Sequence, residues 1–158
     1  MVITAVLSLM AVAGFQRHMR SARGAEAVAV IQAIRSAQES YMAENKIYLN
    51  VSAPNNWYPQ VVPSKQRNAW INSRHTDFPL WQRLAPAVKE TVMFSYLVNA
   101  GPSGTVIPKL AVAHGADLST PQPLDWYAIQ ALGNVDGVGG PSLYATTSMT
   151  GEIYIEGD

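Results

Sequence analysis

The three histidines are the residues whose type best suits chemistry, because an imidazole can ligate a metal or act as a general base. They are His18, His75 and His114, and they lie too far apart to form a paired-histidine metal motif. The chain has no cysteine, which removes disulfides, thiolate nucleophiles and cysteine-bound metals. It also lacks a phosphate-binding P-loop and a G-x-S-x-G nucleophile motif. The sequence therefore indicates neither an enzyme nor a bound cofactor.

A glycine-rich acidic stretch near the C-terminus is the second candidate for metal chemistry. Calcium needs several closely spaced oxygen ligands, as in the D-x-D-x-D-G pattern. Asn134 and Asp136 match two positions of that pattern, but Val138 stands where a third oxygen is required. A single carboxylate supplies few of the oxygen ligands that calcium requires. We interpret the stretch as a glycine-rich turn, with a calcium loop at Asn134 and Asp136 as the alternative.

The composition is that of one domain with a weakly charged surface. The chain has 158 residues with 11 basic and 11 acidic side chains, and its charged share of 14% is below the roughly 25% typical of soluble proteins. Because basic and acidic side chains balance, the composition gives no indication of nucleic-acid binding. A surface with so little charge suits contact with protein or lipid.

An uncharged apolar run, MVITAVLSLMAVAGF, opens the chain and is followed abruptly by Arg17, Arg20 and Arg23. As a helix, the run would span roughly 22 Å, whereas a bilayer core calls for about 20 apolar residues. Three interpretations are open at this point. The run is the core of a signal peptide with an A-x-A cleavage pattern at 11–13, a buried helix of a soluble fold, or part of a membrane helix whose first residues are absent.

The residues that follow favour one long helix. They continue without a proline, and Val30, Ile34 and Tyr41 fall on one helical face. We predict a helix from about residue 2 to about residue 44 that is apolar all round at first and amphipathic later. Gly24 is expected to weaken it by about 1 kcal/mol relative to alanine.

The apolar first part of this helix needs apolar surroundings that the small remainder of the chain cannot supply on every side. We therefore expect it to contact lipid or other copies of the chain. The residues expected to make these contacts are Val2, Ile3, Val6, Leu7, Leu9, Met10, Val12 and Phe15. Arg17, Arg20 and Arg23 are expected to meet countercharges such as Glu26 of another copy.

The remainder of the chain predicts a loop region followed by strands. Prolines interrupt the stretch 50–87, in which we expect a short helical turn at 80–84. The large rings of Trp57, Trp70 and Trp81 are expected to fix this loop onto a sheet.

Strand patterns occur at 91–100, 110–114 and 125–132. A last hairpin is expected from 142–148 and 151–157, joined through Met149, Thr150 and Gly151. Turns this short make the strands antiparallel. The predicted fold class is α+β, with a long N-terminal helix packed on an antiparallel sheet of about four strands.

The end of the predicted helix resembles the type IV pilins and the related pseudopilins. Mature chains of that family commonly read A-x-x-SYxxENxxY at this point, and the chain reads AQESYMAENKIY. The matching residues are Gln38, Glu39, Ser40, Tyr41, Glu44, Asn45 and Tyr48. The stretch DWYAIQALGNVDGVGG is similar to the aromatic strand and Asp/Gly-rich loop near the C-terminus of some pilins. The family's basic leader, processing glycine and fifth-position glutamate do not occur, so the resemblance is to an N-terminally incomplete subunit.

The resemblance implies a structural subunit of a type IV pilus or a pilus-like filament. Residues 1–24 would form the membrane and filament-core helix, and residues 25–158 the globular pilin-like head. The implied partners are other copies in a helical filament, the inner membrane before assembly and the pilus assembly machinery, and the implied location is the bacterial cell surface. A minor pilin, a type II secretion pseudopilin and a secreted binding domain with a cleaved signal peptide are the alternatives.

Overall fold

The computed structural model describes the backbone of residues 2–60, 66–111, 118–134 and 140–157, with side chains from Ser21 onward in these ranges. Its elements in chain order are α1 (Val2–Asn45), β1 (Asn68–Ala69), α2 (Phe78–Leu84), β2 (Thr91–Val92), β3 (Ser95–Gly101), β4 (Trp126–Gly133), β5 (Ser142–Thr147) and β6 (Tyr154–Glu156). The fold is α+β, as predicted.

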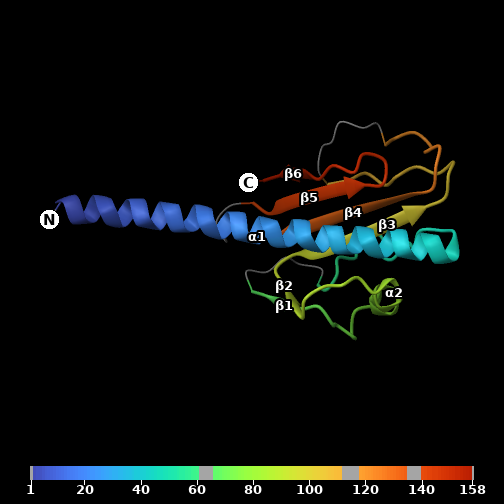
Figure 1. The fold of residues 1–158 in the computed structure, drawn as a ribbon, viewed down its shortest axis with the longest axis horizontal. Helices are drawn as coiled ribbons and strands as arrows, with labels where there is room; N and C mark the ends of the chain where they lie inside the picture. The colour runs from blue at the N-terminus through green and yellow to red at the C-terminus, as the bar shows by residue number, and fades with distance from the viewer. Residues whose placement is uncertain (1, 61–65, 112–117, 135–139, 158) are drawn as a thin grey trace.

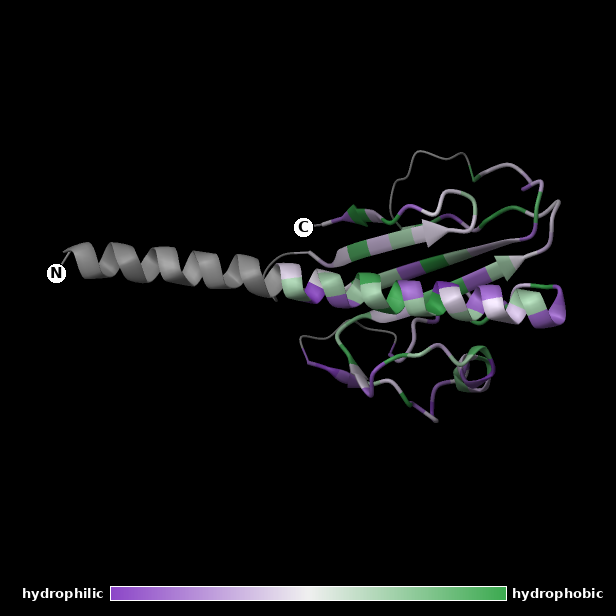
Figure 2. Ribbon diagram, in the orientation of Figure 1, coloured by the Kyte–Doolittle hydropathy of each residue, from purple (hydrophilic) through white to green (hydrophobic). Residues whose placement is uncertain are grey.

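Helix α1 is continuous, as the sequence predicts, and its two halves have different surroundings. The first half extends beyond the rest of the molecule, whereas the second half lies along the sheet (Figure 1). Around the second half, apolar and polar residues alternate (Figure 2). Ala27, Ile31 and Ile34 are fully buried there, because they share the helical face that meets the sheet.

The main sheet has four antiparallel strands in the order β3-β4-β5-β6. Its face toward α1 carries Tyr96, Val98, Ile129 and Tyr144, which belong to one core cluster with the buried residues of α1. Side chains alternate between the two faces of a strand. The intervening residues therefore point to the opposite face, which needs a separate cover.

A segment without strand structure covers that opposite face, and this corrects the prediction of a strand at 110–114. Ile107 and Leu110 pack there against Trp126 and Ala128. Residues 110 and 111 are not in a strand, and the backbone N–H of Ala111 donates to the Gln130 side-chain oxygen at 2.7 Å. The apolar residues are thus spaced to cover a sheet face rather than to extend the sheet. Residues 112–114 lie outside the described ones.

The predicted strand at 91–100 is broken into β2 and β3. Its first part, β2, leaves the main sheet and pairs with β1 in a separate two-stranded sheet. The break follows from a side-chain contact, because the Met93 N–H donates to Glu26 Oε1 at 2.8 Å instead of to a neighbouring strand. The predicted loop at 50–87 contains β1, a short strand that the sequence analysis did not predict.

An aromatic cluster holds the 50–92 region against β3. Tyr58 is fully buried, stacks on Trp81 and meets the edge of Trp70, whose ring also contacts Tyr96 of β3. The expected anchoring role of Trp70 and Trp81 is confirmed. Trp57 is half-buried, and its carbonyl oxygen lies 2.9 Å from His75 Nε2.

The predicted short helix and C-terminal hairpin are both present. Helix α2 includes the expected turn at 80–84 and ends at Leu84, and the next residue, Ala85, adopts a left-handed conformation with φ 49°. Strands β5 and β6 pair as an antiparallel hairpin, with Tyr144 opposite Ile155. Strand β6 is shorter than predicted, because residues 151–153 belong to the connection.

Candidate assembly surface

A buried amide fixes the end of α1 to the following loop. Gln38 has no exposed surface, and its side chain both donates to the Leu49 carbonyl at 2.8 Å and accepts from the Leu49 N–H at 3.0 Å. A buried amide is tolerated when its donor and acceptor are both satisfied. This pair of hydrogen bonds holds the chain reversal after α1 against the helix. The sequence did not indicate that Gln38 and Leu49 would be partners.

Glu26 joins α1 to the two ends of the small sheet, at Arg67 just before β1 and at Met93 just after β2. Its Oε2 lies 2.8 Å from Arg67 Nη2, and its Oε1 accepts the Met93 N–H. The Glu26 side chain is 19% exposed and the Arg67 side chain 45% exposed. Glu26 was predicted to meet arginines of another copy, but its carboxylate has partners within its own head.

Two further polar residues of α1, Arg35 and Glu39, contact other parts of the chain. Arg35 Nη1 donates to the Gly151 carbonyl at 2.9 Å, and the Tyr48 hydroxyl donates to the Glu39 carboxylate at 3.3 Å. Burial, followed by the nearby Glu39 charge, raises the pKa of Tyr48 to about 12. The Tyr48 ring also meets the edge of the buried Tyr127 at 4.9 Å between centroids. These contacts tie α1 to β4 and to the β5–β6 connection.

Gly24 allows α1 to pass close to β5. A Cβ at this position would lie 2.9 Å from the Tyr144 hydroxyl oxygen. The Tyr144 ring is 2% exposed and packs edge-on against Phe94, so it has little room to move. The sequence predicted only a weak point in the helix, but the structure shows that a side chain at this position would crowd the Tyr144 hydroxyl.

Helix α1 forms a groove with α2, β2 and the segment between them. One cavity of about 360 Å³ lies toward the first half of the helix and another of about 450 Å³ lies toward its end. The first is lined by Ala22, Ala25, Glu26, Ala29, Val30, Ala87, Val88, Lys89, Thr91 and Val92. The second is lined by Ala33, Ser36, Ala37, Ser40, Tyr41, Glu44, Arg83, Leu84, Ala85 and Ala87. Because Ala87 lines both cavities, we treat them as one feature, the α1 groove.

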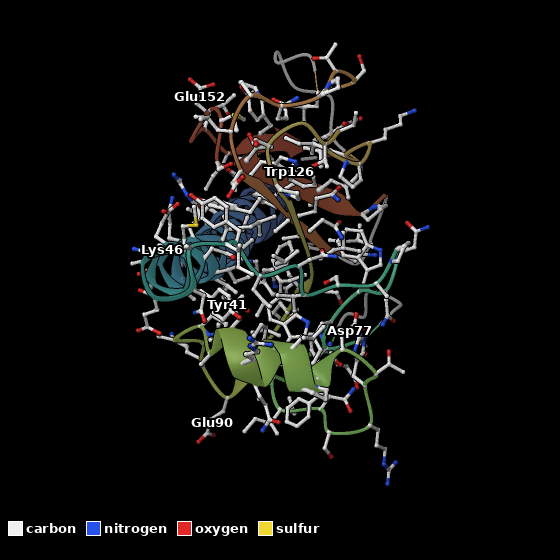
Figure 3. The ribbon with its side chains drawn as sticks, turned by 90° about the vertical axis from the view of Figure 1, so that its right-hand side faces the viewer. Tyr41, Lys46, Asp77, Glu90, Trp126 and Glu152 are labelled. Atoms are coloured by element: carbon white, nitrogen blue, oxygen red, sulfur yellow. The ribbon has the colours of Figure 1, made fainter. Side chains whose placement is uncertain are left out.

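The far end of the α1 groove lies between the two helices. Figure 3 shows Tyr41 between α1 and α2, and the Arg83 guanidinium carbon lies 5.4 Å from the centre of its ring. Within the described part of the chain, the Glu44 carboxylate takes part in no ion pair or hydrogen bond. The far end of the groove is therefore lined by one acidic and one basic side chain, Glu44 and Arg83, which form no ion pair with each other.

The residues predicted to drive assembly all lie in the first half of α1. Their backbone is helical, and their side chains lie outside the described ones: Val2, Ile3, Val6, Leu7, Leu9, Met10, Val12, Phe15, Arg17 and Arg20. Arg23 is half-buried and has an interaction partner. Among the side chains that the structure describes, no helix combines the length and the apolar character needed to cross a bilayer.

Of the candidate metal residues, the structure describes the side chains of His75 and Asn134. His75 packs edge-on against Tyr58, and its Nδ1 accepts the Asp77 N–H at 3.2 Å. Asn134 follows β4 and has a partner, whereas Asp136, His18 and His114 lie outside the described residues. In the described ranges, no three histidine, aspartate or glutamate side chains gather as a metal-binding group.

Comparison with known proteins adds no relative from which a function could be transferred. No protein-family model, curated protein or solved structure matches this chain.

Proposed function

We propose that this protein is a structural subunit of a type IV pilus or of a pilus-like filament, with a pilin-like fold. The observation that carries the proposal is the first half of α1, which extends beyond the head as a helix (Figure 1). Its residues 2–15 carry no charged side chain. A helix that is apolar all round is stable only in lipid or against other apolar helices.

The construction of the head supports the same function. The second half of α1 packs on a four-stranded antiparallel sheet through the buried residues Ile31 and Ile34. Gln38 and Glu26 add polar contacts that hold the helix to the head. The head thus forms a rigid base from which the first half of α1 projects, the arrangement that a subunit needs in order to present an apolar helix to its neighbours.

The proposal is tested by electron microscopy of negatively stained material from cells that produce the full chain, combined with gold-labelled antibody against the head. Filaments decorated along their length are expected. Leu9→Asp places a charge in the apolar run and should abolish sedimentable filaments, since an unpaired charge is costly in apolar surroundings. Ile71→Asp is the matched control, because Ile71 is 73% exposed on the head and the change should leave assembly intact.

Two results would contradict the proposal. One is a full chain that remains a dispersed monomer in the absence of detergent, with Leu9→Asp behaving like the unchanged protein. The other is a native N-terminus created by cleavage after Ala13, which would favour a secreted binding domain. N-terminal sequencing of the native protein distinguishes this domain from a filament subunit.

A further inference from the structure

We infer that the far end of the α1 groove binds a small zwitterion, a free α-amino acid with an aliphatic side chain. The site is the cavity of about 450 Å³ between α1 and α2, which we call the helix-end cavity. Its volume lies within the range of small-molecule sites, about 300–1,000 Å³. This binding goes beyond the proposed filament function and does not depend on it.

The α1 wall of the helix-end cavity combines a polar row of side chains with an apolar row. Residues four apart on a helix lie one above the other on the same face. The members of the polar row and then of the apolar row are Ser36, Ser40 and Glu44, and Ala33, Ala37 and Tyr41. A ligand lying along this wall therefore meets hydroxyls and a carboxylate on one side, and methyl groups and an aromatic ring on the other.

The α2 wall supplies a cation that is held in place. The Arg83 guanidinium carbon lies 5.4 Å from the centre of the Tyr41 ring, where a cation–π attraction favours it. Arg83 is exposed, and its guanidinium makes no ion pair or hydrogen bond with the residues that the structure describes. Its N–H donors are therefore available to a ligand, and a carboxylate is the group that their planar fork fits best.

Two polar groups on the α1 wall are also available to a ligand. The exposed Glu44 carboxylate takes part in no ion pair or hydrogen bond within the described ranges. Tyr41 lines the cavity and is only 8% exposed, yet its hydroxyl has no hydrogen-bond partner in those ranges. A tyrosine buried to this extent normally has a partner for its hydroxyl. The free Tyr41 hydroxyl at the wall of a cavity therefore points to a ligand group that binds it.

The opposite charges of Glu44 and Arg83 determine the class of ligand. A simple anion or a simple cation would be attracted by one of these side chains and repelled by the other. A zwitterion satisfies both, because its carboxylate accepts from Arg83 while its ammonium donates to Glu44. The rest of the ligand then meets the apolar lining, which consists of Ala33, Ala37, Leu84, Ala85 and Ala87. An aliphatic α-amino acid has all three of these features.

Isothermal titration calorimetry of the full chain in detergent micelles tests the site, with L-alanine, L-valine and L-leucine as probes. Saturable binding of at least one probe is expected. For the probe that binds most tightly, the N-acetyl derivative lacks the ammonium charge and the amide derivative lacks the carboxylate charge. Each derivative should bind at least about tenfold more weakly, because each loses one charge-assisted contact.

Two substitutions assign the two charged contacts. Arg83→Gln should weaken binding of the amino acid about tenfold without weakening that of its amide, which has no carboxylate for the guanidinium to hold. Glu44→Gln should weaken the amino acid to a similar extent without weakening the N-acetyl derivative. The matched controls are Arg74→Gln and Glu90→Gln, because both side chains are exposed and line neither cavity of the α1 groove. The control variants should bind like the unchanged chain.

A third substitution tests the cavity itself. Ser40→Phe keeps both charges but places a ring in the helix-end cavity, so it should abolish binding of all three probes. The site is wrong if no probe binds saturably to the unchanged chain. It is also wrong if both derivatives bind as well as the amino acid, or if Glu44→Gln, Arg83→Gln and Ser40→Phe leave binding unchanged. Filaments play no part in the measurement, so the result stands or falls separately from the proposed filament function.

Discussion

The two halves of α1 belong to one continuous helix, but only the second half lies along the sheet (Figure 1). The second half covers its apolar residues with its own chain, and Ile34 has no exposed surface. The first half extends past the sheet (Figure 1). A single secondary structure element thus serves the stability of the head at one end and, by our proposal, assembly at the other.

Because of this difference, substitutions in the two halves should have separate effects, on the unfolding of the head and on association. Apolar contacts within the head contribute to the free energy of unfolding of each copy. By our proposal, contacts made by the first half contribute only to association between copies or with lipid. Each of the following changes tests whether a contact of α1 belongs to the head alone, beginning with the largest expected effect.

Ile34→Ala should lower the free energy of unfolding of the head by about 3 kcal/mol, because it removes buried methyl groups and leaves a cavity. Urea unfolding followed by tryptophan fluorescence measures the change. Val6→Ala is the matched substitution in the first half and should leave head unfolding unchanged. A similar loss for both variants would show that the two halves do not act separately.

Gln38→Leu should cost about 2 kcal/mol, since the buried N–H and carbonyl of Leu49 would both lose their partner. Thermal unfolding measured by circular dichroism gives the loss. Gln32→Leu is the control on the exposed side of the same helix, where a change within about 0.5 kcal/mol is expected. Equal stability of the two variants would remove Gln38 from the contacts that fix α1.

Gly24→Ala should destabilise the head by about 1 kcal/mol, because the new Cβ would crowd the Tyr144 hydroxyl. In the Tyr144→Phe background, which lacks that oxygen, Gly24→Ala should instead stabilise the head, since alanine favours a helix by about 1 kcal/mol over glycine. A double-mutant cycle from urea unfolding measures this coupling. A stabilising effect of Gly24→Ala in both backgrounds would show that the contact does not limit the helix.

Tyr48→Phe should change how the free energy of unfolding depends on pH in the alkaline range. The pKa of Tyr48 is raised from 10.0 to about 12 in the folded protein, so the folded state holds this proton more tightly than the unfolded state does. The contribution is fully present below about pH 10 and is lost as the pH rises toward 12. Unfolding measured from pH 8 to 12 should therefore decline less steeply in the variant. An unchanged slope would contradict the link between Tyr48, Glu39 and folding.

The buried face of α1 could be predicted from the sequence, but the partners of its polar residues could not. The spacing of Val30, Ile34 and Tyr41 indicated the face correctly, because helical periodicity is a local property. Glu26 instead bonds to Met93, which lies 67 residues further along the chain. No local pattern specifies a contact over such a distance.

The sequence by itself determined the continuous α1, the positions of β4 and of the β5–β6 hairpin, and the apolar character of residues 2–15, since each depends on neighbouring residues along the chain. Only the tertiary structure decided that the segment before Ala111 covers the sheet rather than joins it, that Gly24 serves close packing, and that a groove follows α1. These features depend on which distant segments meet. Local hydropathy and turn patterns cannot distinguish among the many ways in which a chain can cover its apolar surface.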